Sequence, residues 1–481
     1  MKKVHFVGLC GIGMSATALL MKEAGYEVTG SDAECYGPPG DILKRGGLSP
    51  FLGYTPDNIP ADIDEFVIGR NAKLSPEEND EARAAHESGK PIRSFPEVLG
   101  ALTQGRKNVV IAGSYGKSTT TTLIAHILRH AGVDAGYFIG AEPARPGGEN
   151  KVLPAPSSLG TAPSFVLEGD EYPSSHDDSR AKFMHLHPTD LVLTAVVHDH
   201  VNVYPTFESY KKPFEELLAK VPDDGIVVAC ADEVGARTMA EASGKKVVLY
   251  GIRDGIYRAT NIRFGERTRF TLVKDDQEIA EMETGLLGEH NVEDIVAASA
   301  YVLARGLVTP DALAKAVAVF SGVRRRLDNI APRSSVPVFE GFGSSYEKAR
   351  AAIDAMRLHF ATRQLVIVFE PHTFGWRNRA NLTWYDTVFA GAGLVLVTPP
   401  ATQGANTHDQ LSYDEIMDRV RATGAQVETY DPHAVLSSVQ HLHPNDAVLV
   451  LTSGDLEGTL ETFARTMEEQ FPIATESAAD A

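Results

Sequence analysis

Short apolar runs of the kind that form buried strands alternate along the whole chain with longer runs that have helical spacing. This alternation predicts parallel sheets built from strand–helix–strand units, and therefore an α/β fold. The first block of the pattern contains the runs VHFVGL, EVTGSD and EFVIG. It ends in the polar, proline-marked segment ESGKPIRSFPEVLG, so we place a domain boundary near residue 105.

A second block begins at NVVIAGS and continues through FVLEGD, DLVLTAVV, GIVVACAD and KVVLYGI. Two runs with helical spacing, between residues 290 and 320, close it. Within this block, residues 142–164 are rich in Pro, Gly and Ser and predict a long loop. A third block repeats the rhythm in VPVFEGF, LVIVFEP, LVLVTP and AVLVLTS. We therefore predict three domains, at residues 1–105, 106–328 and 329–481, a number that the chain length also suggests.

Composition narrows the class of protein. With 43% apolar and 23% charged residues, the chain has the composition of an ordinary soluble globular protein. No apolar run reaches the length of about 18 residues that a membrane span needs. The formal net charge is −19, and an acidic chain has no reason to bind nucleic acid or an anionic membrane. An anionic small-molecule substrate would need a local cationic pocket.

The chain has three cysteines, Cys10, Cys35 and Cys230, and none has the close spacing of a metal site. A disulfide framework would need more cysteines, so the sequence predicts a reducing, cytoplasmic compartment. The N-terminal run VHFVGLCGIGM is typical of a first strand and turn rather than of a signal peptide.

Three glycines, Gly8, Gly11 and Gly13, lie between the first predicted strand and the first predicted helix. Glycines there allow a tight turn and let a diphosphate approach the backbone N–H groups at the helix N-terminus. Asp32 follows the second predicted strand, where an acidic residue often meets a ribose. The spacing G-x-x-G-x-G differs from G-x-G-x-x-G, so a nicotinamide oxidoreductase is not favoured. A glycine-rich turn without a ligand is the alternative to a phosphate site.

The stretch VVIAGSYGKSTTTTLIAHIL has the order strand, glycine turn, helix that a nucleotide-phosphate loop requires. Lys117 would bind β- and γ-phosphate oxygens, Ser118 would bind Mg²⁺, and the backbone N–H groups would bind the remaining oxygens. Only two residues separate Gly113 from Gly116, whereas the common phosphate loop has four. The flanking strand and helix still favour nucleotide-phosphate binding. The four threonines at 119–122 are unusual at the start of a helix unless they belong to the core.

Acidic and histidine residues follow two further predicted strands. Glu168, Asp170 and Glu171 come at the end of the run FVLEGDE, and the triplet His-Asp-His at 198–200 follows LVLTAVV. Carboxylates at the carboxyl end of a strand, in a sheet that carries a phosphate loop, are well placed as Mg²⁺ ligands. A solvated acidic loop and a surface turn are the alternatives.

Two later motifs lie near the end of the second block. In GEHNVED, His290 and Asn291 begin a predicted helix, where they can contact a base edge or cap the helix. In GVRRRLD, three arginines occupy the predicted junction with the third domain. They are either a solvated basic cluster or the source of an arginine that stabilises transferred charge.

Taken in order along the chain, these motifs resemble those of the Mur ligases, which join amino acids or peptides to a carboxylate during peptidoglycan synthesis. GSYGKST is similar to the family's G-T-H/N-G-K-T-T, and G-x-x-G-x-G-M-S is similar to the turn of the subgroup that accepts UDP-N-acetylmuramate. GEHNVED is similar to G-x-H-N-x-x-N, with Asp294 in place of the last Asn, and GVRRRLD is similar to G-V-K-R-R-F-E. The resemblance covers nearly the whole chain.

Within that subgroup, EGDEYPSSHDDSRAKFMHLHP is most similar to the murein peptide ligase branch. That branch attaches a recycled tripeptide, L-alanyl-γ-D-glutamyl-meso-diaminopimelate, to UDP-N-acetylmuramate. The branch that adds L-alanine is the second candidate. Its E-A-D-E-S-D pattern fits less well, although EPHTF at 370–374 favours it.

The resemblance implies a Rossmann-like N-terminal domain for the UDP-sugar, a central ATPase-type domain with a phosphate loop, and a Rossmann-like C-terminal domain for the incoming amine. It implies ATP and Mg²⁺ as cofactors, with UDP-N-acetylmuramate and an amino acid or short peptide as small-molecule partners. The implied UDP-sugar residues are Gly8, Gly11, Gly13 and Asp32. The implied ATP residues are Gly113, Ser114, Gly116, Lys117, Ser118, Thr119, Asn291 and Arg326. The implied metal ligands are Ser118, Glu168 and His200, and the implied catalytic residues are Lys117, Glu168, His200 and Arg326.

The implied reaction uses ATP to convert the lactyl carboxylate of UDP-N-acetylmuramate into an acyl phosphate, which an amine then attacks to form an amide. Addition of the tripeptide, in peptidoglycan recycling, is the main prediction, and addition of L-alanine, in synthesis, is the alternative. Arg377 and Arg379, in GWRNRAN, are candidates to hold a carboxylate of the amine substrate, or they belong to a solvated basic loop.

Two segments depart from the family pattern. EGFGSSY has Gly341 where the family has a second acid, and Ser344 and Ser345 where it has two histidines. TAVVHDHVN lacks the Asn, the Glu and the last Asp of T-N-I-E-x-D-H-x-D. The departures leave one alternative of another class, a relative that binds nucleotide or UDP-sugar without turnover.

Overall fold

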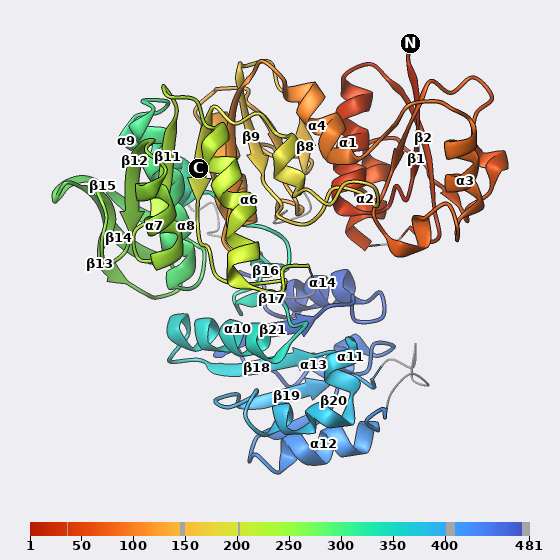
Figure 1. The fold of residues 1–481 in the computed structure, drawn as a ribbon. Helices are drawn as coiled ribbons and strands as arrows, with labels where there is room; N and C mark the ends of the chain where they lie inside the picture. The colour runs from red at the N-terminus through yellow and green to blue at the C-terminus, as the bar shows by residue number, and fades with distance from the viewer. Residues whose placement is uncertain (36, 145–149, 201–202, 401–408, 474–481) are drawn as a thin grey trace, which may run out of the picture.

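The computed structural model describes residues 1–35, 37–144, 150–200, 203–400 and 409–473, in which three sheets each carry packed helices (Figure 1). In Figure 1 the first sheet (red to orange) lies beside the central one (yellow to green), and the third (cyan to blue) lies below the central one. The expected fold class, three α/β domains, is confirmed. Among the described residues, no helix combines the length and the apolar character needed to cross a bilayer.

The first sheet is wholly parallel, with the strand order β3-β2-β1-β4-β5. The order reverses between β1 and β4, and open α/β sheets bind ligands outside the carboxyl ends of the strands at such a point. The elements are β1 (Lys3–Val7), α1 (Ile12–Glu23), β2 (Glu27–Asp32), α2 (Gly37–Arg45), β3 (Phe51–Leu52), β4 (Glu65–Ile68), α3 (Asp80–Glu87), β5 (Ile92–Arg93) and α4 (Phe95–Thr103).

The central sheet has the strand order β15-β14-β13-β12-β11-β10-β6-β9-β7-β8. Its middle strands pair in parallel, and β14, β15 and β8 add antiparallel edges. The loop expected at 142–164 contains β8, and its residues 145–149 lie outside the described ones. The elements are β6 (Lys107–Ala112), α5 (Lys117–His130), β7 (Gly136–Phe138), β8 (Ser157–Ser158), β9 (Ser164–Glu168), β10 (Asp190–Leu193), α6 (Phe207–Lys220), β11 (Ile226–Cys230), α7 (Val234–Ala242), β12 (Lys246–Gly251), β13 (Tyr257–Arg263), β14 (Thr268–Lys274), β15 (Gln277–Thr284), α8 (Glu289–Ala304) and α9 (Pro310–Ala318).

The third sheet has the strand order β16-β17-β21-β18-β19-β20 and is parallel except for the β16–β17 pair. Its first strand begins at Arg326, so the three-arginine run leads directly into this sheet. The elements are β16 (Arg326–Asn329), β17 (Val338–Phe342), α10 (Tyr346–His359), β18 (Gln364–Phe369), α11 (Phe374–Arg377), β19 (Leu394–Val397), α12 (Tyr413–Arg421), β20 (Gln426–Thr429), α13 (Val435–Val439), β21 (Asp446–Thr452) and α14 (Leu460–Gln470).

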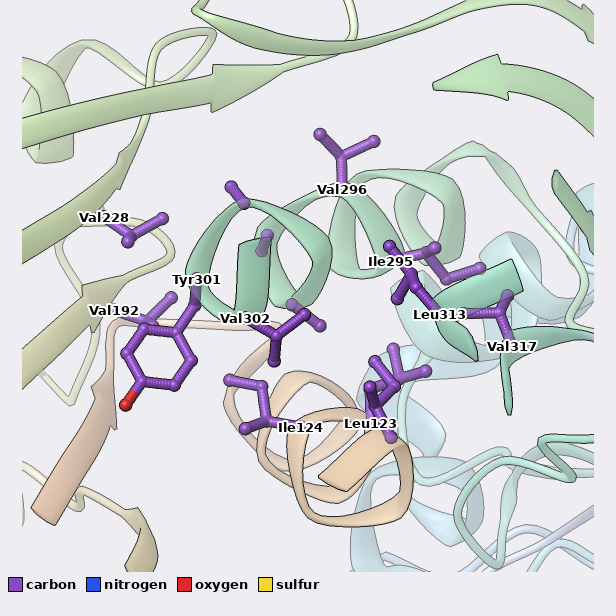
Figure 2. Packing of buried hydrophobic residues seen from close by; sticks show 14 of the residues in the cluster. Leu123, Ile124, Val192, Val228, Ile295, Val296, Tyr301, Val302, Leu313 and Val317 are labelled. Atoms are coloured by element: carbon purple, nitrogen blue, oxygen red, sulfur yellow. The ribbon is translucent and has the colours of Figure 1, made fainter. Parts of the chain in front are cut away.

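Helix α5 is buried along its first three turns, which explains its unusual threonine run. Thr120, Thr121 and Thr122 are fully buried. The buried Thr122 hydroxyl has a hydrogen-bond partner, because it donates to Ser118 O over 2.6 Å. Figure 2 shows the next residues of α5 packing with side chains of α8 and α9 in one apolar cluster. This cluster anchors the helix whose N-terminus follows the phosphate loop, so the loop stands on a rigid base.

The cysteines differ from the sequence expectation. Cys10 and Cys35 form a disulfide with their Cα atoms 5.5 Å apart, whereas Cys230 is a buried free thiol. The count and spacing of the cysteines did not indicate this pair. Parallel pairing of β1 with β2 brings the segments that follow these two strands together.

A buried pair of carboxyl groups lies at the start of the third sheet. Asp328 of β16 and Glu340 of β17 are cross-strand neighbours. The Arg325 backbone N–H donates to Asp328 Oδ1 over 2.6 Å, and Arg325 Nε lies 3.2 Å from Glu340 Oε1. Burial, and then the charge of Glu340, raises the pKa of Asp328 to about 8. Burial also raises the pKa of Glu340, so the pair keeps a proton at neutral pH.

This raised pKa predicts that part of the stability of the chain is lost as pH rises. Folding favours the protonated Asp328, so its contribution is complete below the ordinary pKa near 3.8 and disappears by about pH 8. We expect Asp328→Asn to remove this dependence. The melting temperature of the variant, measured relative to that of the native chain, should therefore rise by roughly 4 °C between pH 5 and pH 8. Differential scanning fluorimetry measures it, with exposed Asp311→Asn as the control. A difference that stays constant with pH would contradict the prediction.

Candidate active site

The loop between β6 and α5 places backbone N–H groups at the N-terminus of a helix. Gly116, with φ +76°, is the N-cap residue of α5, and Gly113 has φ +145°. A Cβ atom on Gly113 would clash with the Thr194 hydroxyl, and one on Gly116 would lie 2.6 Å from Asp294 Oδ1. Both positions therefore require glycine. The backbone N–H groups of the first helical turn and the positive dipole end of α5 suit an anion at this loop.

Ser118, Glu168 and Arg326 converge beside this loop from three separate segments. The Ser118 hydroxyl donates to Glu168 Oε1 over 2.7 Å, and Arg326 Nη2 donates to the Ser118 oxygen over 3.0 Å. Glu168 Oε2 accepts from the Gly140 N–H over 2.7 Å, which fixes the carboxylate. A hydroxyl and a carboxylate side by side are hard oxygen ligands of the kind Mg²⁺ takes together with phosphate oxygens. Two of the three predicted metal ligands therefore fit the ion.

His200, the third predicted metal ligand, has a different partner. Its Nε2 lies 3.0 Å from Glu171 Oε1, and its ring packs against Tyr172. Strand β10 ends at Leu193, so the triplet at 198–200 lies beyond the strand rather than at its end, which corrects the expectation. In the part of the chain that the structure describes, no three His, Cys, Asp or Glu side chains gather as a metal site. Metal binding by His200 stays a prediction.

Glu171 connects two of the predicted catalytic residues, whereas the sequence pattern placed it only among the carboxylates that could bind Mg²⁺. Its side chain is 1% exposed and lies between Lys117 Nζ and His200 Nε2, with a distance of 3.0 Å to each. Lys117 Nζ also donates to Gly113 O over 2.5 Å. Glu171 therefore balances the ammonium charge and holds it over the phosphate loop. The sequence signal for Glu171 was the group of acids Glu168, Asp170 and Glu171 at the end of β9.

Replacement of Glu171 is expected to lower kcat more than it weakens nucleotide binding. In Glu171→Gln, Lys117 loses the carboxylate that orients its ammonium group. The transition state, which depends on that orientation, therefore loses more stabilisation than bound ATP does. We expect kcat to fall about tenfold while the KM for ATP stays within about twofold. Steady-state phosphate release measures both, with Glu208→Gln on the exposed face of α6 as the matched control. If Glu171→Gln loses stability together with kcat, and Glu171→Asp restores neither, Glu171 has a structural role instead.

A cavity of about 560 Å³ opens from the phosphate loop toward the third sheet. The loop and the start of α8 line one side, and β17 and α10 line the other. Its size is typical of a site for a nucleotide or another molecule of that size. Seven of the predicted ATP residues line it, and Gly113 does not: Ser114, Gly116, Lys117, Ser118, Thr119, Asn291 and Arg326.

The start of α8 carries polar groups into this cavity. Asn291 Nδ2 donates to Leu287 O over 2.7 Å and lies 3.2 Å from His290 Nε2, and burial lowers the pKa of His290. Burial raises the pKa of Asp294 well above its usual range, and its Oδ1 accepts from the Thr120 hydroxyl over 3.2 Å. In its protonated form Asp294 would offer an O–H donor beside a carbonyl acceptor, and an asparagine side chain likewise carries donors beside a carbonyl acceptor. Its replacement of the family's last Asn is therefore compatible with an intact loop.

The wall from the third sheet shows the surroundings of Gly341, which stands where the family has a second acid. A Cβ atom on Gly341 would lie 3.2 Å from Leu451 Cδ2 and 3.4 Å from Ala352 Cβ, so a side chain at this position would press on apolar neighbours. The next residue, Phe342, is 39% exposed in the cavity, and Lys348 Nζ lies 5.5 Å from its ring centroid. The Phe342 ring offers a surface for stacking, and the Lys348 ammonium offers a positive charge, next to the place where the family has an acid.

The predicted UDP-sugar residues meet at the carboxyl ends of β1 and β2. Gly8 has φ +85°, Gly11 is the N-cap residue of α1, and a Cβ atom on Gly13 would lie 2.9 Å from the Phe95 ring. Asp32 is the last residue of β2. The turn therefore approaches the start of α1 as a phosphate-binding turn does.

Arg377 and Arg379, the candidates for holding the amine substrate, have different surroundings. Arg379 forms ion pairs with Asp409, over 2.9 Å, and with Glu415. Arg377 is 8% exposed, and burial lowers its pKa. Arg379 therefore has structural partners of its own, while a carboxylate-binding role for either arginine stays a prediction.

Comparison with known proteins gives matches over nearly the whole chain. A family model described as the Mur ligase middle domain matches residues 111–302, and one described as the Mur ligase family, catalytic domain, matches residues 3–107. A UDP-N-acetylmuramate–L-alanine ligase of Psychrobacter sp. (strain PRwf-1) is 32% identical over 78% of this chain and 76% of its own.

Two solved structures extend the likeness to the fold. The UDP-N-acetylmuramate–alanine ligase of Thermotoga maritima superimposes with a TM-score of 0.78 at 22% identity, over 98% of this chain and 100% of its own. The UDP-N-acetylmuramate:L-alanyl-γ-D-glutamyl-meso-diaminopimelate ligase of Neisseria meningitides gives a TM-score of 0.60 at 27% identity, over 68% of this chain and 100% of its own.

Proposed function

Because this chain belongs to the Mur ligase family, whose members are ATP-dependent amide ligases, we propose that it forms an amide on the lactyl carboxylate of UDP-N-acetylmuramate. The observation that carries the proposal is the convergence of Lys117, Ser118, Glu168 and Arg326 beside one cavity between the second and third sheets. In this proposal the first domain, residues 1–105, binds the UDP-sugar. Residues 106–328 bind ATP, and residues 329–481 bind the amine.

The chemistry explains why cations are gathered at the loop. A carboxylate is a poor electrophile, so it is first phosphorylated to an acyl phosphate, which brings two anions together. Lys117 and Arg326 offset their repulsion and bind the charge that develops on the transferred phosphoryl group. Mg²⁺, held by Ser118 and Glu168, would supply further charge neutralisation to the phosphate oxygens.

The amine then attacks the acyl carbon, a C–N bond forms, and inorganic phosphate leaves. Water competes with the amine for the same carbon, so the site must be shielded. The cavity lies between two sheets, which allows the third domain to exclude water as it closes. Holding both substrates there supplies a large share of the rate.

L-Alanine is the amine that the comparisons favour. The curated relatives that match most of this chain are named UDP-N-acetylmuramate–L-alanine ligase, so the sequence expectation of the murein peptide ligase branch as the closest one is not confirmed. The tripeptide is the second candidate. The EGDEY pattern supports it, as does the likeness to the Neisseria meningitides ligase.

The alternative of another class is a relative that binds nucleotides without turnover. Its support is the loss of the second acid at Gly341 and of the histidines at Ser344 and Ser345. In that case UDP-N-acetylmuramate and ATP would bind with no amide product.

A panel of amines tests the proposal. The purified chain is given ATP, Mg²⁺, UDP-N-acetylmuramate and one of L-alanine, L-serine, glycine or the tripeptide, and both phosphate release and amide mass are recorded. We expect phosphate release that requires the sugar nucleotide and an amine, with the largest kcat/KM for L-alanine. A largest value for the tripeptide would select the second candidate. Binding of both nucleotides without amide product from any amine would refute the ligase and support the non-catalytic alternative.

A further inference from the structure

The disulfide between Cys10 and Cys35 lies at the glycine turn of the first sheet. Cys10 is between Gly8 and Gly11, the glycines that shape the turn, and Cys35 follows the end of β2 by three residues. Both cysteines are half-buried, so neither residue is sealed in the core as Cys230 is. The bond therefore joins the turn directly to the segment that leads into α2.

Asp32, the last residue of β2, holds a backbone donor of the turn. Its Oδ2 accepts from the Cys10 N–H over 2.7 Å, and its Oδ1 accepts from the Ala33 N–H and the Tyr54 hydroxyl. A turn N–H that is bonded to a carboxylate is not free to donate to a diphosphate. The negative charge of that carboxylate also repels an approaching anion.

We propose that Cys10 and Cys35 are a redox-active pair, and that their disulfide keeps the turn in a form that binds a sugar nucleotide weakly. The bond ties the 33–35 segment against the turn and so keeps the Asp32 carboxylate on the Cys10 N–H. Once the bond is broken, hydrogen bonds and apolar packing, but no covalent link, hold this arrangement. A diphosphate can then displace the carboxylate and take the N–H. The inference rests on the proposed function, because it assumes that the sugar nucleotide binds at this turn.

The switch is a thiol–disulfide exchange with a dithiol reductant. One thiolate of the reductant attacks a sulfur of the Cys10–Cys35 bond and forms a mixed disulfide. Its second thiol then closes the reductant's own disulfide. Two electrons and two protons pass to the chain, which ends with two thiols, while the reductant is oxidised to its disulfide.

Cys230 provides an internal contrast. It is buried and unpaired, and burial raises the pKa of its thiol to about 12. The thiolate is the reactive form, so Cys230 should not exchange at neutral pH. The redox response of this chain should therefore come from Cys10 and Cys35 alone.

The test measures binding of UDP-N-acetylmuramate by calorimetry to the full chain, once oxidised and once reduced with dithiothreitol. Alkylation followed by mass spectrometry verifies the state of each cysteine. We expect reduction to lower the Kd at least fivefold. Cys35→Ser, which leaves the turn sequence intact, should bind like the reduced chain and should not respond to dithiothreitol. Cys230→Ser, the matched control, should respond as the native chain does.

The outcomes separate this inference from the proposed function. Equal or weaker binding after reduction overturns the redox pair while leaving the ligase proposal standing. Free Cys10 and Cys35 thiols after treatment with oxidised dithiothreitol also overturn it. Absence of UDP-N-acetylmuramate binding in both redox states overturns the proposed function and this inference together. If Cys35→Ser does not fold, the comparison of the native chain in its two states decides alone.

Discussion

Lys117→Ala is expected to lower the rate of amide formation by about 10³-fold or more while the chain stays folded. The Lys117 ammonium stands over the loop that Gly113 and Gly116 shape, at the N-terminus of α5. Without it, the Glu171 carboxylate faces the triphosphate uncompensated, so repulsion adds to the lost attraction. Phosphate release in the presence of both substrates measures the loss.

Folding of this variant must be measured separately. Glu171 keeps His200 as a partner over 3.0 Å, so we expect the melting temperature to fall by less than about 4 °C. Lys107→Ala is the matched control, because this exposed lysine begins β6, the strand that leads into the loop. Activity of Lys117→Ala within about tenfold of the native chain would refute the assignment of the site.

Arg326→Met is expected to lower kcat about 100-fold with little effect on stability. Arg326 Nη2 contacts the Ser118 hydroxyl, beside Glu168 and the mouth of the cavity, where the transferred phosphoryl group would lie. A methionine retains most of the apolar stem but removes the charge and the donors. Single-turnover formation of ADP in the absence of the amine isolates the affected step, because ADP leaves when the acyl phosphate forms.

The neighbouring Arg325 is the matched comparison. Its guanidinium donates to Gly454 O over 2.6 Å and pairs with the buried Glu340. Arg325→Met therefore removes a structural contact, and we expect it to lower the melting temperature by roughly 4 °C or more. Equal kcat values in the two variants would show that the run acts as a diffuse basic cluster, contrary to the assignment of one arginine to the phosphates.

The strand–helix alternation and the glycine turns were predictable from the sequence because both are local. Periodicity identified the α/β class, and the helices near 290–320 lie at Glu289–Ala304 and Pro310–Ala318. The order strand, glycine turn, helix also predicted where Lys117 and Ser118 would lie, since α5 begins at Lys117. Contacts within a few residues of each other are enough for these inferences.

Other features depend on contacts between distant segments. Glu171 is 54 residues from Lys117, and its role is visible only once the ends of β6, β9 and β10 lie together. The Cys10–Cys35 bond depends on the pairing of β1 with β2. Gly341 stands where the family has an acid, and only the fold shows that Leu451 and Ala352 are the neighbours a side chain there would meet.

By itself, the sequence determined the class of fold and the chemical groups available, because periodicity and turn chemistry are properties of neighbouring residues. Tertiary structure decided which of those groups act together. Arg324, Arg325 and Arg326 are indistinguishable as a basic run. In the folded chain the first donates to Glu142, the second pairs with Glu340 and the third reaches Ser118. The physical reason is that successive residues at the junction of two sheets point in different directions, and only the packing of those sheets determines what each side chain meets.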